Sequence, residues 1–227
     1  MLLYPPATSE FTRLVTFGAG SQIGSHITQL LATYPSIVHI TVVNRTINDR
    51  VITLLDRLRG DHPAAQFTAI SRTDGGTQVE SAVRQADLVC CATCSTAPLF
   101  PSEWVRPGTH VILVGSYKRE MAEVDTALIR RARKILVDSR SACAIEAGEL
   151  IAAGAQPEDV VEVGELLLYG ASDSWQVDTA RVSELLTGSD VTIFKSVGLG
   201  GQDVAISVAS VNRAIEMEIG TRIPFEQ

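Results

Sequence analysis

Short apolar runs alternate with amphipathic stretches along roughly the first 140 residues of the chain. The apolar runs predict strands at Leu14–Phe17, Val38–Val43, Phe67–Ser71, Asp87–Ala92, His110–Val114 and Lys134–Val137. Apolar residues at helical spacing predict helices at Ser21–Tyr34, Asn48–Arg59, Thr77–Gln85 and Val124–Ala132. Several strands are apolar throughout, as in a parallel sheet that is covered on both faces. The pattern therefore predicts an α/β fold, a doubly wound (Rossmann) parallel sheet with helices on both faces.

The remaining sequence is less regular. It predicts one helix at Ala142–Ala153, strand-and-loop segments at Pro157–Gly170 and Asp190–Gly201, and a final helix at Gln202–Met217. In the final helix Val204, Val208, Val211 and Ile215 form an apolar stripe, so we expect a homodimer that buries it. No repeat or low-complexity linker marks a boundary, so we expect one Rossmann-type domain over residues 1–227.

The composition narrows the classes of partner. Asp+Glu (26) exceed Lys+Arg (19), giving a formal net charge of −7, and no nucleic-acid or anionic-membrane surface follows, because phosphates need clustered cations. No window approaches the ~20 apolar residues of a membrane span. Met1–Glu10 has no basic segment typical of a secretory signal, and four cysteines do not make a disulfide scaffold. We therefore expect a cytoplasmic protein with reduced thiols.

The first predicted strand runs into Gly18-Ala-Gly-Ser-Gln-Ile23, which opens the first predicted helix. Strand, glycine turn and helix form the context of a dinucleotide-binding fingerprint. The first glycine allows the tight turn, and the second lets the backbone approach a pyrophosphate at the helix N-terminus. Ile23 departs from the small residue of the fingerprint and would hold the helix slightly away from the sheet. A glycine turn without a ligand is the alternative.

The end of the second predicted strand indicates which dinucleotide binds. NAD-binding domains place an acid there to bind the ribose 2′-OH, whereas this chain has Asn44-Arg-Thr46. An acid would repel a 2′-phosphate, and an amide, a guanidinium and a hydroxyl would bind it. The sequence therefore predicts NADP(H) rather than NAD(H), with a solvated turn as the alternative.

Further segments match a known family. In order, the matching segments are 17–22, 44–46, 86–89, 92–95, 98–100, 104–110, 114–116, 137–139, 146–148, 163–166, 192–198 and 202–203. On these residues the chain resembles the ornithine cyclodeaminase/mu-crystallin family, which includes NADPH-dependent ketimine reductases and alanine dehydrogenases. The resemblance implies a pyrophosphate site at Gly18, Ala19, Gly20, Ser21 and Gln22, a 2′-phosphoribose site at Asn44, Arg45 and Thr46, and a nicotinamide side at Thr93, Cys94, Ser95, Val114, Gly115 and Ser116. Ordinary strand-end turns are the alternative for the last set.

Two departures from the family affect the expected chemistry. Members usually have a longer N-terminal part that completes a substrate and dimerisation domain, so we expect residues 190–227 to be a remnant of it. The cyclodeaminases carry a proton-transferring aspartate where this chain has Tyr117. A phenol with an unperturbed pKa near ~10 is not a carboxylate base, although it is a weak acid donor. Ornithine cyclodeamination is therefore not expected.

Four other positions carry open alternatives. Lys118 and Arg119 would bind an acidic substrate or be solvated, and Lys195 would reach the surface or face the cleft. Glu165 would be an acid of shifted pKa, or a cap or ion-pair partner. Cys91-Ala-Thr-Cys94 predicts buried core thiols rather than a metal site, because no second pair or histidine cluster accompanies it.

Three functions remain open at this point. The first is an NADPH-dependent reductase of a C=N bond in a cyclic imine, ketimine or imino acid, a small-molecule substrate, with Tyr117, Lys118 and Lys195 as candidate catalytic residues. The second is a redox-neutral cyclase, lyase or isomerase, and the third is a non-catalytic NADP(H)-binding protein.

Overall fold

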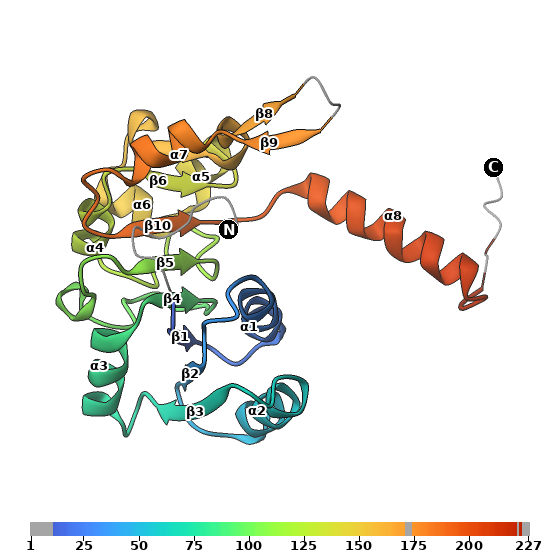
Figure 1. The fold of residues 1–227 in the computed structure, drawn as a ribbon, viewed down its shortest axis with the longest axis horizontal. Helices are drawn as coiled ribbons and strands as arrows, with labels where there is room; N and C mark the ends of the chain where they lie inside the picture. The colour runs from blue at the N-terminus through green and yellow to red at the C-terminus, as the bar shows by residue number, and fades with distance from the viewer. Residues whose placement is uncertain (1–10, 171–173, 222, 224–227) are drawn as a thin grey trace. The chain divides into compact units, whose positions relative to one another are not determined.

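In a computed structural model, which describes residues 11–170, 174–221 and 223, a parallel sheet runs through the fold (Figure 1). Its strand order is β3-β2-β1-β4-β5-β10-β6-β7, and every pairing is parallel. The strands are β1 (Arg13–Phe17), β2 (His39–Asn44), β3 (Gln66–Ser71), β4 (Leu88–Cys91), β5 (His110–Leu113), β6 (Ile135–Val137), β7 (Val160–Glu162) and β10 (Thr192–Lys195). The predicted doubly wound sheet is confirmed, and its connections reverse direction between β1 and β4.

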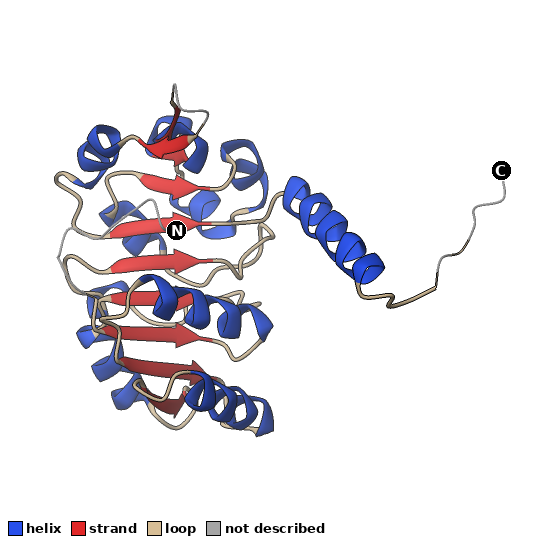
Figure 2. Ribbon diagram, turned by 45° about the vertical axis from the view of Figure 1, so that its right-hand side comes forward, coloured by secondary structure: helices blue, strands red, loops and turns tan. Residues whose placement is uncertain are grey.

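Helices cover both faces of this sheet (Figures 1 and 2). They are α1 (Ser21–Thr33), α2 (Asp49–Asp61), α3 (Gly76–Gln85), α4 (Thr126–Arg131), α5 (Arg140–Glu146), α6 (Gly148–Ala153) and α7 (Thr179–Leu186). Apolar side chains of α1 and α2, among them Ile27 and Leu55, share one buried cluster with Leu14 and Ile40 of the sheet. Side chains of α3 to α6 form a second cluster with residues such as Val15 and Val111. The neighbours Leu14 and Val15 thus point to opposite faces, which explains why β1 is apolar throughout.

The segment predicted as one helix at Ala142–Ala153 is two helices. The chain leaves helical geometry at Ala147, and α6 starts again at Gly148. A Cβ atom on Gly148 would lie 2.0 Å from the carbonyl oxygen of Met121, so the backbone of a distant loop packs directly against this position. That tertiary contact, which the apolar spacing does not encode, accompanies the break.

Helix α7 was not predicted, and neither was the hairpin of β8 (Leu167–Tyr169) and β9 (Trp175–Val177). The side chain of Asp178 caps α7 by accepting a hydrogen bond from the backbone N–H of Arg181, and Val182 and Leu185 are buried. Two buried residues in an eight-residue helix are too few for a periodic signal.

Residues Gly198–Gln227 form a second unit, whose described helix is α8 (Gly200–Glu216). The predicted apolar stripe lies on α8, and none of the side chains of this helix is buried. The assignment of residues 190–227 to a remnant domain remains a prediction, although β10 pairs with β5 and β6 inside the sheet. The expectation for Met1–Glu10 lies outside the described residues. No described helix is long and apolar enough to span a membrane.

Candidate functional site

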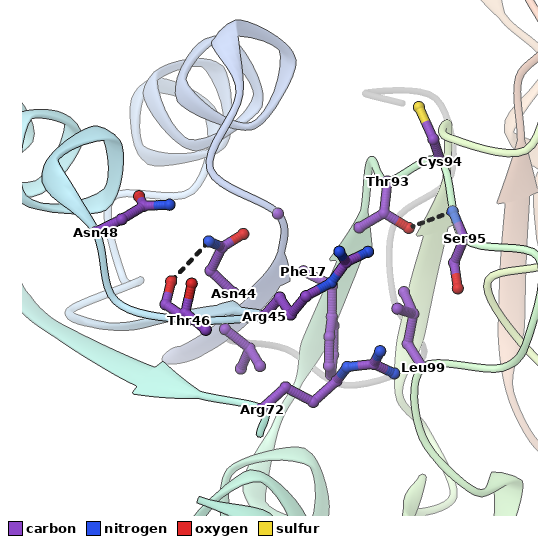
Figure 3. A pocket seen from close by; sticks show the side chains of 12 residues that line it. Phe17, Asn44, Arg45, Thr46, Asn48, Arg72, Thr93, Cys94, Ser95 and Leu99 are labelled. Atoms are coloured by element: carbon purple, nitrogen blue, oxygen red, sulfur yellow. Dashed lines mark hydrogen bonds between the residues drawn. The ribbon is translucent and has the colours of Figure 1, made fainter. Parts of the chain in front are cut away.

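A cavity of about 350 Å³ lies at the carboxyl ends of β1 to β4, where the sheet reverses its connections. Ligands of open α/β sheets bind at this place. Its wall consists of Phe17, Gly18, Val43, Asn44, Arg45, Thr46, Asn48, Arg72, Thr93, Cys94, Ser95 and Leu99 (Figure 3). The structure thus brings together three of the predicted segments, from the loops after β1, β2 and β4.

The glycine turn after β1 has the geometry that a pyrophosphate needs. Gly18 has a φ of +107°, and a Cβ atom there would lie 2.9 Å from the carbonyl oxygen of Ala92. Gly20 precedes α1, and among the residues that the structure describes no side chain caps this helix and no acid lies in its first turn. The first N–H groups of α1 are therefore available to an anion, and the residues present fit a dinucleotide.

Hydrogen bonds to backbone carbonyl oxygens hold the loop after β2 in place. The side-chain amide of Asn44 donates to the carbonyl oxygen of Thr46 (2.9 Å). The carbonyl oxygen of Arg45 accepts from the backbone N–H (3.2 Å) and the hydroxyl (2.9 Å) of Thr73, and from the hydroxyl of Ser71 (3.2 Å). The loops after β2 and β3 are thus joined directly behind Arg45.

Arg72 is a cavity residue that the sequence reasoning missed. It follows β3, and its backbone N–H donates to the carbonyl oxygen of Asn44 (2.8 Å). In Figure 3 the side chains of Arg45 and Arg72 extend in the same direction across the cavity. Neither guanidinium forms an ion pair with another residue in the part of the chain that the structure describes. Arg72 directly follows a predicted strand, at the same edge of the sheet as Asn44, and this position could have identified it from the sequence as a cavity residue.

Glu123 joins the loops that follow β4 and β5, a role that no pattern in the sequence predicts. Its Oε1 accepts from the backbone N–H (2.6 Å) and the hydroxyl (2.9 Å) of Thr93, and its Oε2 accepts from the backbone N–H of Gly115 (2.8 Å). Glu123 is fully buried, and this burial raises its carboxyl pKa, although the hydrogen bonds act in the opposite direction.

Lys195 lies in a buried polar cluster, so both predicted placements, on the surface or in the cleft, are wrong. Its Nζ donates to the carbonyl oxygen (2.5 Å) and the hydroxyl (2.6 Å) of Ser116 and lies 3.4 Å from Oε1 of Glu149. The Ser116 hydroxyl also donates to Glu149. All three residues are at most 1% exposed. The predicted catalytic role of Lys195 remains a prediction.

The other candidates lie outside the cavity wall. Tyr117 is 44% exposed, and the ammonium of Lys118 lies 5.7 Å from the centre of its ring. Ala19, Gly20, Ser21, Gln22, Val114, Gly115 and Ser116 do not line the cavity either. Gly115 lies directly behind the wall, since a Cβ atom on it would be 2.0 Å from the carbonyl oxygen of Thr93.

The role of Glu165 follows from its contacts. Glu165 is a cap and ion-pair residue, because it forms a capping box with Glu162 and ion pairs with Arg140 (2.5 Å) and Arg181 (2.7 Å). Its hydrogen bonds, first that from the backbone N–H of Glu162, lower its carboxyl pKa.

The expectation of buried thiols in the Cys91-x-x-Cys94 segment is only half right. Cys91 is buried, but Cys94 is exposed in the loop after β4. No group of three or more histidine, cysteine or acidic residues suited to a metal ion occurs among the residues described.

The sequence model of the ornithine cyclodeaminase/mu-crystallin family matches residues 7–217. The chain belongs to this family. It is 33% identical to Protein SAR DEFICIENT 4 of Arabidopsis thaliana over 84% of this chain and 55% of that protein. It is 33% identical to a Delta(1)-pyrroline-2-carboxylate reductase of Paracoccus denitrificans over 88% of this chain and 58% of that protein. The chain therefore spans little more than half the length of these curated relatives.

Solved structures show the same fold. The structure of Thermococcus litoralis Delta(1)-pyrroline-2-carboxylate reductase in complex with NADH and L-proline matches 97% of this chain and 63% of that chain, with a TM-score of 0.74 and 21% identity. The iminosuccinate reductase of Paracoccus denitrificans in complex with NAD+ matches 99% of this chain and 63% of that chain, with a TM-score of 0.74 and 22% identity.

Proposed function

We propose that the chain binds NADP(H) and acts as a reductase of a C=N bond in a small imino acid or cyclic imine. Family membership supports the class of reaction, because relatives at 33% and 30% identity are named Delta(1)-pyrroline-2-carboxylate reductases. The observation that carries the proposal is the cavity at the switch point of the sheet, which runs from Arg45 to Thr93 beside an uncapped helix N-terminus.

The preference for NADP(H) over NAD(H) rests on charge. A 2′-phosphate brings about two negative charges. Arg45 and Arg72 supply two positive charges in one cavity, whose wall contains no acidic side chain among the described residues. Two unpaired guanidinium groups that face the same space repel each other until an anion binds. We assign Arg45 to the 2′-phosphate, with Thr46 beside it and Arg72 as the second cation.

When bound, NADPH would supply the hydride. Gly18 and the N-terminus of α1 would bind its pyrophosphate, and Thr93–Ser95 would line its nicotinamide half. Proton donation is assigned to Tyr117, an exposed phenol one residue beyond the Gly115–Ser116 turn. Lys118, the neighbour of its ring, would attract the carboxylate of an imino acid.

The test of this function is NADPH oxidation in the presence of Delta(1)-pyrroline-2-carboxylate and a panel of related cyclic imines. Oxidation that requires both the imine and the protein supports the reductase. Conversion of an imine without loss of NADPH would select a redox-neutral enzyme, and NADPH binding without any conversion would select a binding protein.

Cofactor binding can be measured separately from activity, through the reactivity of Cys94. Of the four cysteines, Cys94 alone is exposed, and it lies on the cavity wall. Bound NADPH should therefore slow the alkylation of Cys94, and 2′,5′-ADP should give less protection. Unchanged alkylation at saturating NADPH would contradict the proposed site.

We further propose a homodimer that works in the cytoplasm. Val204, Val208, Val211 and Ile215 are 54–70% exposed, and a two-fold pair of helices would bury this stripe on both subunits. The unpaired cysteines suit a reducing compartment. Light scattering tests the dimer, which Val208→Asp should dissociate. A single-chain mass at micromolar concentration would contradict it.

A further inference from the structure

The side chain of Glu123 joins two loops through a buried carboxylate, which is an unusual arrangement. A buried carboxylate is costly unless hydrogen bonds and charges compensate it. Here both oxygens are used, and they accept three hydrogen bonds from Thr93 and Gly115. Lys195, a cation that acts on Glu123 electrostatically, makes its own hydrogen bonds to Ser116.

Glu123 accepts hydrogen bonds from two backbone N–H groups in the loops that follow two adjacent strands of the sheet. Thr93 follows β4 and Gly115 follows β5, and these two strands pair in parallel. The loops approach so closely that only glycine is accommodated at position 115, where a Cβ atom would lie 2.0 Å from the carbonyl oxygen of Thr93. The backbone carbonyl oxygen of Glu123 also accepts from the N–H of Leu99 (2.8 Å).

These contacts converge on one side of the cavity. Thr93 and Leu99 both line it, and both are hydrogen-bonded to Glu123, which does not line it. The opposite side, with Arg45 and Arg72, is joined by a separate set of bonds through Ser71 and Thr73. Glu123 therefore acts on one half of the cavity only.

We propose that Glu123 is a positioning residue that fixes the Thr93–Ser95 wall for the nicotinamide half of the dinucleotide. The proposal rests on the proposed function, because it assigns the two halves of the cavity to the two halves of NADP(H). A carboxylate is required because it accepts at both oxygens. A glutamine amide would turn its NH₂ group toward the N–H of either Thr93 or Gly115, and two donors would face each other.

The test compares Glu123→Gln with a matched control, Asp87→Asn, in the full chain. Asp87 also accepts from two backbone N–H groups, those of Thr12 and Arg13 (both 2.8 Å), but it lies at the amino end of β4, the opposite edge of the sheet. Two ligands are titrated, NADPH and 2′,5′-ADP, which contains only the adenine half. Amide hydrogen exchange is measured without any ligand.

Glu123→Gln should weaken NADPH by about tenfold, the effect of losing one charge-assisted hydrogen bond, and leave 2′,5′-ADP affinity unchanged. Exchange of the Thr93 and Gly115 amides should accelerate in this variant and not in Asp87→Asn. Equal weakening of both ligands, unchanged NADPH affinity, or the same ligand pattern in Asp87→Asn would overturn the proposal.

The test remains decisive if Glu123→Gln does not fold, and also if the wild-type chain binds neither ligand. If Glu123→Gln does not fold, Thr93→Val removes the hydroxyl bond to the Glu123 carboxylate together with the bond that the hydroxyl accepts from the backbone N–H of Ser95 (3.3 Å) in the same wall. It leaves the two backbone bonds to Glu123 in place and should give a smaller loss of NADPH affinity with 2′,5′-ADP unchanged. An equal loss for the two ligands would contradict the proposal in that variant too. If the wild-type chain binds neither ligand, the proposed function is wrong. If the Thr93 and Gly115 amides of Glu123→Gln exchange no faster than those of the wild type, the positioning role of Glu123 is wrong.

Discussion

The ammonium group of Lys195 donates hydrogen bonds to both the carbonyl and the hydroxyl oxygen of Ser116, over 2.5 and 2.6 Å. Lys195 ends β10, and Ser116 lies in the loop after β5, the neighbouring strand. Glu149, at the start of α6, is the third member of this buried polar cluster. A lysine that follows four apolar or β-branched residues thus fixes the turn that carries Tyr117.

Lys195→Met should destabilise the fold strongly. The substitution leaves the Glu149 carboxylate buried without its cation, and breaking a buried ion pair on one side costs about 3–5 kcal/mol of unfolding free energy. The double variant Lys195→Met/Glu149→Gln should recover part of that loss. Urea unfolding measures both free energies, and a single variant within about 1 kcal/mol of wild type would show that the pair contributes little.

Arg45→Ala should weaken NADPH selectively. The direct, charge-assisted contact with the 2′-phosphate would disappear, raising the NADPH dissociation constant by one to two orders of magnitude, or about 1.5–3 kcal/mol. NADH affinity should hardly change, because that ligand has no 2′-phosphate. Fluorescence titration of both nucleotides measures the difference, and equal losses would mean that Arg45 does not bind the phosphate.

No conversion of ornithine to proline is expected. The resemblance assigns the proton-transfer carboxylate of the cyclodeaminases to the position of Tyr117, a phenol that is 44% exposed. A phenol side chain is not the carboxylate base that the resemblance assigns to this position in the cyclodeaminases. The measurement is ammonia release from ornithine with NAD+ present, and release above the protein-free background would refute the expectation.

The stability of the fold should fall as the pH drops below about 6.5 because of His110. Burial lowers the pKa of this imidazole to about 3, and its Nδ1 lies 2.7 Å from the Thr192 hydroxyl oxygen. Between these pKa values the unfolded chain binds a proton that the folded chain does not, so acid favours unfolding. In His110→Asn, unfolding free energies from neutral pH to about pH 4 should vary less. An unchanged pH dependence would assign it to other groups.

The sequence predicted the features that depend on local pattern. β1 to β5 and the cavity segments at Gly18, Asn44–Thr46 and Thr93–Ser95 follow from apolar runs that end in small or polar residues, and such ends meet at one edge of a parallel sheet. The placement of β10 between β5 and β6 did not follow, because strand order depends on contacts between distant residues.

The roles of Glu123 and Glu149 were missed for one physical reason. Glu123 and Glu149 look like the ordinary acids at helix starts, and only the tertiary fold buries them against backbone N–H, hydroxyl and ammonium groups. The predicted placement of Lys195 failed for the same reason. A charged residue in an apolar run signals burial only when its partners are known, and these lie 46 and 79 positions away in the sequence, at Glu149 and Ser116.

The most direct test of the proposed reductase activity follows the transferred hydride. The chain is incubated with Delta(1)-pyrroline-2-carboxylate or a related cyclic imine and with NADPH that carries deuterium at the transferred position of nicotinamide C4, and the product is examined by mass spectrometry. A C=N reductase predicts an amine with one deuterium on the former imine carbon, formed faster with NADPH than with NADH. Product without deuterium, or no product while NADPH is bound, would contradict the proposed reductase activity.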